Sequence, residues 1–431
     1  MLTNSKKLVA AGVGMLLLAA ACSSSSNNKL ASTSTTAPGG GQTTTTAANS
    51  PAPGSKGTYT VGVYSDLSGL AASGNKTSVQ GVQAGIAWAA TQGYKINYVV
   101  ADTASSPSTA LSAAQKLVQQ DHVDAVISVS SLMLLADKYL TTQGVPVVGV
   151  AEDGPEWITA KNMFSVFGPL DTTKVATTFG DFFKAQGVTT VGSLGYSISP
   201  LSAESAKAAE VAAENAGLKK GYVDAQFAFG GTNVQPVALA MKTAGVDGVT
   251  AAVDPNTGFA LITALRQAGV VLKAALLPTG YGGDLLQAGP GALQAAQNVF
   301  FLSSFEPIEM NTPGTQQFQN ALKSVGITQD PTYAEYAGYT SIVLLVQALN
   351  AAGPSANHSA IINALSGITS WNGAGLFGTH SIDLSQRTVA AVGVDNCFWI
   401  TKLSGSTFQL VDGEDPLCGT IIPGKTVSAS S

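Results

Sequence analysis

The chain has few charged residues and few of the side chains that hold metals. Its 431 residues include 21 Lys and Arg, 26 Asp and Glu, three His and three Cys, so the formal net charge is 21 − 26 = −5. Mild acidity without a basic run argues against a nucleic-acid partner. His122, His358 and His380 have no Cys or carboxylate neighbours at metal-ligand spacing, so no metal site is expected.

Sequence motifs for catalysis and for cofactor binding are missing as well. No Gly-x-Ser-x-Gly segment follows a strand in the manner of a nucleophile elbow. Adjacent carboxylates such as Glu152 and Asp153 do not by themselves establish a converging acid and base. The sequence therefore supports neither an enzyme nor a cofactor.

The first 22 residues have the pattern of a secretory signal. Lys6 and Lys7 precede an apolar run, Leu8 to Leu18, which is too short to span a bilayer comfortably. The run ends in Ala19-Ala20-Ala21-Cys22, which resembles the lipobox of bacterial lipoproteins, with Ala19 where Leu is more usual. This resemblance implies that residues 1–21 are a signal peptide and that Cys22 is lipidated. An ordinary signal peptide with a coincidental cysteine is the alternative.

Residues 22–57 predict a disordered tether. They contain runs such as Ser23 to Ser26 and Thr43 to Thr46 and have almost nothing apolar to bury, so folding could not offset their ordering entropy. Behind a lipid anchor, such a segment holds a folded domain away from the outer face of the cytoplasmic membrane. No later segment is apolar for long enough to cross a membrane.

The remaining two cysteines form an even pair. In an exported protein Cys397 and Cys418 predict a disulfide, with two free thiols as the alternative. The bridge would close a loop of about twenty residues and contribute roughly 3 kcal/mol on the chain-entropy model.

Strand-like and helix-like patterns alternate from Thr58 onward. Thr58 to Tyr64 is a β-rich run, Thr77 to Ala90 repeats apolar residues at helical spacing, and the alternation begins again with a helix expected over 172–186. Strands separated by single helices specify parallel sheets with right-handed crossovers. The sequence therefore predicts an α/β fold with two Rossmann-like lobes, each a parallel sheet flanked by helices.

The last third of the chain departs from this alternation. Helices are expected over 312–325 and 333–351, followed by an antiparallel pair of strands over 387–401 and 406–411. From Pro423 there is no core pattern, and the tail should fray.

The order of these elements resembles a known family. From Thr58 to Val411 the chain is similar to type I periplasmic, or solute-binding, proteins of the branched-chain amino-acid class, extracytoplasmic receptors that feed ABC transporters. The local matches are Val61-Gly62-Val63 with Leu67-Ser68-Gly69, Gln80 to Gly85, Val126 to Ser131 with Gly144 to Val148, and Leu265 to Gly269.

The resemblance implies a monomer whose two lobes are joined by three hinge crossovers. Lobe 1 would comprise residues 58–169 and 303–386, lobe 2 would comprise 170–302 and the hairpin 387–420, and 421–431 would be a tail. The ligand would lie in the cleft between the lobes, at the carboxyl ends of the strands.

Two loops of lobe 1 are the first candidates for ligand contacts. Ser130 and Ser131 end a strand and open a helix, where hydroxyls and free N–H groups make a site for a polar or anionic group. In the family this loop holds the ligand's carboxylate; the alternative is that Ser131 is a helix cap. The second loop is Ala151-Glu152-Asp153, in which Asp153 departs from the family's hydroxyl residue. Either Asp153 points away as a helix cap for Pro155-Glu156-Trp157, or the ligand is not an ordinary α-amino acid.

Lobe 2 offers further candidates: Tyr196, Ser202, Asp254 and Tyr281. The resemblance aligns Gly280 with the acid that often meets an ammonium group, so that acid is missing. Asp254 would replace it or would be a strand-end cap before Pro255. Tyr281 could stack on the ligand. Glu335 and Tyr336 either close the side of the cleft or belong to the helix surface and core.

These features predict a lipid-anchored receptor that captures a small polar solute, such as an amino acid or an amide, and delivers it to an ABC transporter permease. A sensory lipoprotein of the same fold is the alternative. A lipid-anchored hydrolase is the third class considered, and it lacks a visible nucleophile and base.

Overall fold

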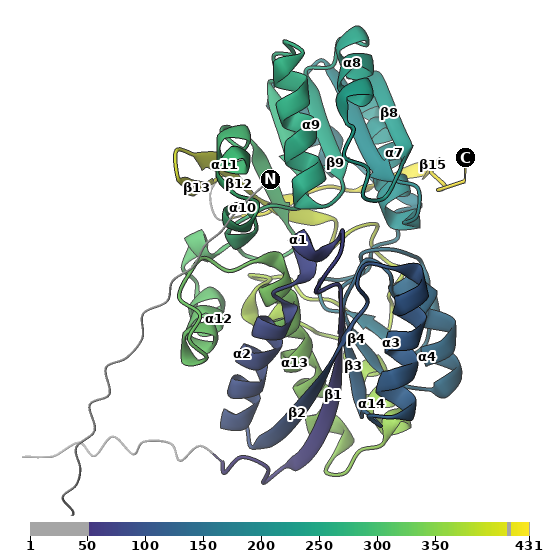
Figure 1. Ribbon diagram of the computed structural model, residues 1–431, viewed down its shortest axis with the longest axis vertical. Coiled ribbons are helices and arrows are strands. Elements are labelled where there is room, and N and C mark those ends of the chain that lie inside the picture. Colours follow the sequence, from purple (N-terminus) through teal and green to yellow (C-terminus); the bar gives the residue numbers. More distant parts are fainter. Residues whose placement is uncertain (1–50, 412–414, 431) are drawn as a thin grey trace, which may run out of the picture. The chain divides into compact units, whose positions relative to one another are not determined.

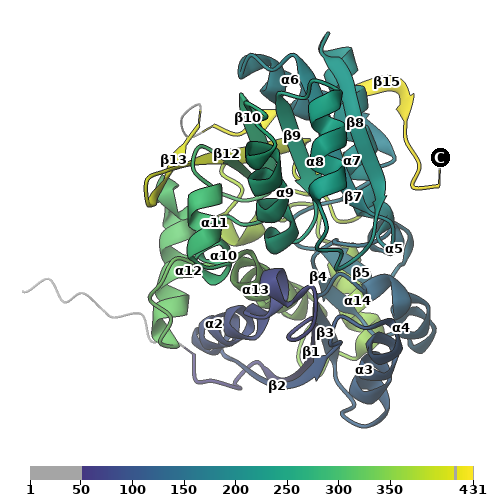
Figure 2. The ribbon, with the colours of Figure 1, turned by 45° about the horizontal axis from the view of Figure 1, so that its top comes forward.

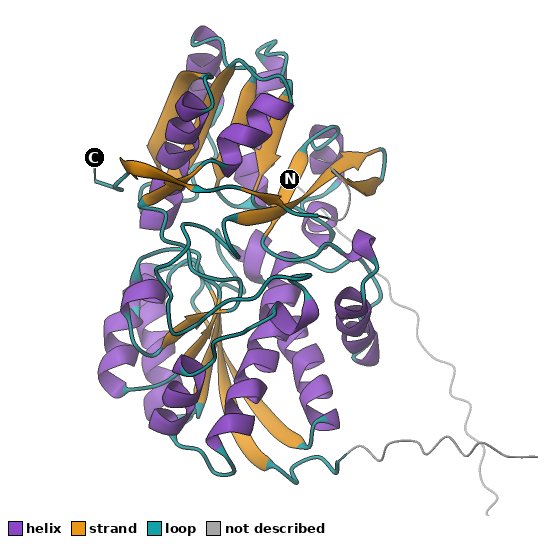
Figure 3. Cartoon of the chain, turned by 180° about the vertical axis from the view of Figure 1, so that it is seen from behind, coloured by secondary structure: helices purple, strands orange, loops and turns teal. Residues whose placement is uncertain are grey.

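The computed structural model describes residues 51–411 and 415–430, so Cys22, the expected signal peptide and most of the tether lie outside the described residues. Two β-sheets carry the fold, and both are flanked by helices (Figures 1 and 3). The α/β prediction with two parallel-dominated sheets is confirmed.

The first sheet is entirely parallel and has the order β2-β1-β3-β4-β5. One of its faces packs on α2 and α13 and the other on α3 and α4, so its central strands are buried on both sides. The elements of this lobe are β1 (Gly57–Ser65), α1 (Ala72–Asn75), α2 (Ser78–Thr91), β2 (Tyr94–Asp102), α3 (Pro107–Gln119), β3 (Ala125–Val129), α4 (Asp137–Gln143), β4 (Val147–Gly149), α5 (Glu156–Thr159), β5 (Met163–Ser165), α12 (Pro313–Ser324), α13 (Tyr333–Ala352) and α14 (His358–Ser366).

The second sheet has the order β13-β12-β11-β10-β9-β7-β8, parallel from β8 to β11 and antiparallel at β12 and β13. Figure 2 shows β7, β8, β9 and β10 side by side, with α8 and α9 in front of the sheet and α6 and α7 behind it. The elements of this lobe are α6 (Thr178–Ala185), β7 (Thr190–Tyr196), α7 (Pro200–Asn215), β8 (Lys219–Phe227), α8 (Gln235–Thr243), β9 (Gly248–Ala252), α9 (Pro255–Gln267), β10 (Ala274–Leu277), α10 (Gly283–Gln287), α11 (Pro290–Ala295), β11 (Phe300–Ser303), β12 (Cys397–Ser404) and β13 (Thr407–Leu410).

The chain passes between the two lobes between β5 and β7, between β11 and α12, and between α14 and β12. Helix α13 is fixed against α2 by a close backbone contact. A Cβ atom added to Gly81 would lie 2.2 Å from the Glu335 carbonyl oxygen, and one added to Gly338 would lie 2.4 Å from the Ser78 carbonyl oxygen. Two glycines therefore let the helices touch, and this contact sets the position of Tyr333 at the start of α13.

Cys397 and Cys418 form a disulfide, as predicted, and join β12 to the short strand β14 (Leu417–Cys418). The strand expected from residue 387 begins only at Cys397. The Asn396 side chain accepts hydrogen bonds from the N–H groups of Ala391 (2.7 Å) and Val392 (3.2 Å), which folds this segment into a turn.

The prediction that the tail from Pro423 frays is wrong. Ile421–Thr426 forms β15, which pairs antiparallel with β6 (Lys174–Ala176). Residues 174–176 therefore belong to a strand and not to the helix expected over 172–186. Ile422 is buried in a small apolar cluster with Val175 and Ala212, and this contact orders the tail. Among the described residues, no helix is long and apolar enough to cross a membrane.

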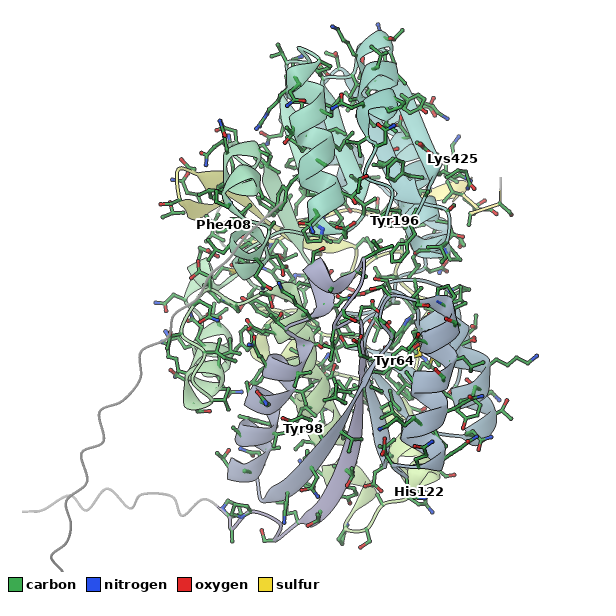
Figure 4. The ribbon with its side chains drawn as sticks, in the orientation of Figure 1. Tyr64, Tyr98, His122, Tyr196, Phe408 and Lys425 are labelled. Atoms are coloured by element: carbon green, nitrogen blue, oxygen red, sulfur yellow. A yellow bond between two sulfur atoms is a disulfide. The ribbon has the colours of Figure 1, made fainter. Side chains whose placement is uncertain are left out.

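The tail contact predicts a stability effect. Ile422→Ala should lower the free energy of unfolding by about 2 kcal/mol, because it leaves a cavity between β15, β6 and α7. Urea unfolding followed by far-UV circular dichroism measures the loss. Lys425→Ala, at the exposed outer part of the same strand in Figure 4, is the control and should change stability by less than about 0.5 kcal/mol. Equal effects of the two substitutions would show that β15 does not dock through Ile422.

Candidate functional site

A cavity of about 230 Å³ lies where the carboxyl ends of the two sheets meet. Liquid water occupies about 30 Å³ per molecule, so the space suits a solute of roughly amino-acid size. Figure 4 shows Tyr196 at the part of its lobe that faces the other lobe. The polar and charged residues that line the cavity are Asn75, Ser131, Glu152, Thr172, Tyr196, Ser199, Ser202, Ser205, Thr250, Asp254, Thr279, Asp284, Ser303, Ser304 and Tyr333.

The wall from the first lobe is organised by a buried carboxylate, Asp66, just after β1. Asp66 accepts hydrogen bonds from the Ser130 hydroxyl (2.8 Å), the Ser131 N–H (2.8 Å), the Asn75 amide (3.0 Å) and the Thr103 hydroxyl. Ser131 and Asn75 line the cavity, whereas Ser130 is fully buried behind it. Ser130 therefore supports the wall and does not face the ligand space.

Glu152 extends this network into the cavity. Its Oε2 accepts from the Asn75 amide (3.1 Å) and from the Ser131 hydroxyl (3.3 Å). Burial, and then the charge of Asp66, raises the pKa of Glu152 to about 8. At neutral pH the Glu152 carboxyl is therefore largely protonated while no ligand is bound.

Asp153 points away from the cavity, although Ala151 and Glu152 line it. The Asp153 carboxylate accepts from the Leu134 N–H (2.6 Å) and from the Trp157 indole (3.4 Å). It is not a helix cap, because no side chain caps α5. Burial raises the pKa of Asp153, and burial together with the Asp153 charge raises that of the neighbouring Glu156 further, so Glu156 carries the proton of the pair. Of the two possibilities for Asp153, the structure favours the one in which it does not meet the ligand.

Asp254 lines the cavity and is also the N-cap of α9, accepting from the N–H groups of Asn256 (3.0 Å) and Thr257 (3.2 Å). The Thr257 hydroxyl (2.6 Å) and the Tyr196 hydroxyl donate to it as well, and so does Ser73 from the first lobe (3.1 Å). The carboxylate is therefore occupied by the protein's own donors, and the capping alternative is the one observed.

The other candidates from the second lobe differ in whether they line the cavity. Tyr196 and Ser202 line the cavity, and the Ser202 hydroxyl accepts from the Tyr196 N–H (2.7 Å). Tyr281 does not line it: its ring packs edge-on against Phe408 on β13, and its hydroxyl bonds Glu309. Glu335 completes the capping box of α13, and Tyr336 is buried in the core, so neither reaches the cavity.

Several lining residues escaped the sequence analysis, among them Asn75, Asp284 and Tyr333. Asp284, in α10, is 2% exposed; its Oδ2 accepts from the Tyr333 N–H (3.2 Å), and its Oδ1 is buried without a hydrogen-bond partner. Burial raises the pKa of Asp284 well above its usual range. The pKa of the Tyr333 phenol is raised well above its usual range by burial and by the charges of Glu152 and Asp284. The only sequence signal was the glycine-rich loop, 280–283, that precedes Asp284.

The fold and the cavity together define a two-lobed receptor of the type I periplasmic binding class. The profile of the periplasmic binding protein family matches residues 58–407, and the chain belongs to this family. The comparison with curated proteins found no match.

Solved structures share the fold at low sequence identity. A leucine-binding protein from Thermotoga maritima has a TM-score of 0.68 at 16% identity, covering 84% of this chain and 98% of its own. An ABC-transporter solute-binding protein from R. palustris, in complex with benzoate, has a TM-score of 0.68 at 17% identity, covering 86% and 99%. Another from Rhodopseudomonas palustris HaA2, in complex with p-hydroxybenzoic acid, has a TM-score of 0.66 at 18% identity, covering 86% and 98%.

The position of Ser130 predicts a structural role. Ser130→Ala should lower the free energy of unfolding of the ligand-free protein by about 1–3 kcal/mol, because it removes a donor to buried Asp66 and an acceptor for the Leu132 N–H. Thermal and urea unfolding measure the change. Ser112→Ala, at an exposed hydroxyl on α3, is the matched control. Unchanged stability together with a loss of ligand affinity would return Ser130 to the ligand site.

Proposed function

We propose that this protein is an extracytoplasmic solute receptor that encloses a small polar molecule between its lobes and delivers it to an ABC transporter permease. The observation that carries the proposal is the cavity at the carboxyl ends of both sheets, lined by polar side chains from both lobes. Membership of the periplasmic binding family supports it.

We propose Ser131, Ala151, Glu152, Tyr196 and Ser202 as contacts of the ligand, with Asn75, Asp284 and Tyr333 added. The three interlobe crossovers act as the hinge, so that a ligand touching both lobes favours the closed state. The protein works as a monomer and is held at the membrane only through the lipid on Cys22.

A ligand screen tests the receptor function. The chain from Ser23 to Ser431 should melt at a higher temperature with one chemical class among amino acids, amides, amines, polyols, sugars and aromatic acids. A ligand that binds only the folded state stabilises it by about 2.7 kcal/mol at one hundred times its dissociation constant. Differential scanning fluorimetry measures the shift, and bovine serum albumin serves as the control for nonspecific effects. A folded protein that responds to none of these classes would contradict the proposal.

Lipid anchoring has its own test. Full-length protein expressed in a bacterial host should incorporate an alkyne-labelled fatty acid and sediment with membranes, whereas Cys22→Ser should do neither, because its hydroxyl replaces the modified thiol. Fluorescence of the labelled band on a gel and fractionation measure the two effects. Ser24→Ala, two residues along the predicted tether, is the control and should behave as the parent. Labelling that survives in Cys22→Ser would favour the ordinary signal peptide.

A further inference from the structure

The cavity contains acidic side chains and no basic partner. Glu152, Asp254 and Asp284 line it, and none of the described residues around it is Lys, Arg or His. The carboxylate of Asp254 already accepts hydrogen bonds from donors of the protein itself. Glu152 and Asp284 are therefore the acids with capacity left for a ligand.

Of these two acids, Asp284 gives the stronger reason to expect a ligand that donates a hydrogen bond. It is 2% exposed, and its Oδ1 has no hydrogen-bond partner within the described part of the chain. A buried polar atom without a partner destabilises a folded protein, and a ligand that supplies a donor removes this cost. Lys76 attracts the Asp284 charge from outside the cavity, but it makes no ion pair with it among the described residues.

In the loop after β3, the donors that would bind an anion are already occupied. After β3, the Ser131 N–H bonds Asp66 (2.8 Å), the Leu132 N–H bonds the Ser130 hydroxyl (3.2 Å), and the Leu134 N–H bonds Asp153 (2.6 Å). The Ser131 hydroxyl donates to Glu152. A carboxylate placed against this wall would therefore find its N–H groups already used by the protein's own oxygens and would face an acid.

The remaining walls suit an apolar or aromatic body. Tyr196 and Phe229 meet edge to face with their ring centroids 5.3 Å apart, and both rings line the cavity together with Tyr333. Aromatic faces attract cations within about 6 Å of the ring centroid.

From these contacts we propose that the cavity selects a small organic cation, a primary ammonium or an amidinium carried on an apolar body, and excludes solutes whose only charged group is a carboxylate. Asp284 Oδ1 accepts from the cation, and Glu152 supplies a second acid from the first lobe. This assignment deepens the receptor function and rests on it.

Glu152 gives the selectivity a characteristic dependence on pH. It is faced by Asp66 and Asp153, by its donors Asn75 and Ser131, and by Tyr333 of α13. Its raised pKa of about 8 means that Glu152 gains a proton as the pH falls below 8. A cation binds the ionised carboxyl better, so its affinity should rise with pH, by up to about tenfold per unit for one linked proton. A carboxylate ligand would show the opposite sign.

The test uses probes that share a carbon skeleton and differ in charge. Isopentylamine, phenethylamine and their guanidine analogues are compared with 4-methylpentanoate and 3-phenylpropanoate by calorimetric titration of the chain from Ser23 to Ser431, at pH 6.5 and pH 8.5. We expect the cations to bind more tightly at pH 8.5 and the carboxylates not to bind. Tight carboxylate binding that weakens at pH 8.5 overturns the cation assignment but leaves the receptor function standing. Binding by neither series overturns the cation assignment, and the broader melting screen then decides the receptor function separately.

Two variants test which carboxyl group binds the cation. Asp284→Asn keeps the shape of the side chain and should weaken cation binding about ten- to hundredfold, while the melting temperature of the free protein shows that it folds. Asp330→Asn, an exposed acid outside the cavity, is the matched control and should bind as the parent does. If Asp284→Asn does not fold, Glu152→Gln tests the second acid, and its cation affinity should rise less steeply with pH than that of the parent, because only the raised pKa of Asp284 then remains. Cation affinity within twofold of the parent, in whichever of the two variants folds, overturns the assignment.

Discussion

A single buried carboxylate organises the wall of the cavity formed by the first lobe. Asp66 is fully buried, and each of its oxygens accepts two hydrogen bonds: Oδ1 from Thr103 and Ser130, Oδ2 from Asn75 and the Ser131 N–H. A buried charge is tolerated only when its acceptor positions are filled, so the segments after β2 and β3 and the end of α1 are held together. Burial, and after it the same charge, raises the pKa of Glu152, which links the packing of this lobe to the chemistry of the cavity.

The sheets could be predicted because their signals are local. Alternating strand and helix patterns are properties of short windows, and the parallel part of both sheets followed from them. The pairing of β15 with β6 could not be predicted from the sequence. It joins two short segments about 250 residues apart through Ile422 and Val175, and neither segment has a strong pattern alone. The late start of β12 depends on one side chain, Asn396, that bonds back to the preceding turn.

The candidate site was predictable at the level of loops and less so at the level of side chains. Strand ends indicated the correct loops, but neighbouring residues in extended backbone point in opposite directions. Ser131 and Glu152 therefore face the cavity, while Ser130 and Asp153 turn into the protein. The position of Asp284 at the cavity depends on a contact that the sequence does not reveal. The backbone at Gly283 lies against residues 330–331, and the Gly283 N–H donates to the Pro331 carbonyl (3.0 Å).

The contacts between the lobes bear on how the charge of a bound ligand would affect closure. Ser73 bonds Asp254 across the cleft, and the Ser199 hydroxyl bonds the Asp153 carbonyl (3.0 Å), so protein groups already hold part of the interface. A ligand changes the equilibrium only through contacts that differ between the open and closed states. Glu152 of the first lobe and Asp284 of the second both lie near Tyr333, and after burial their charges raise the pKa of its phenol. Under the cation assignment proposed above, a bound cation would attract one acid from each lobe at once. It would make both contacts only between closed lobes, so its charge would favour the closed form.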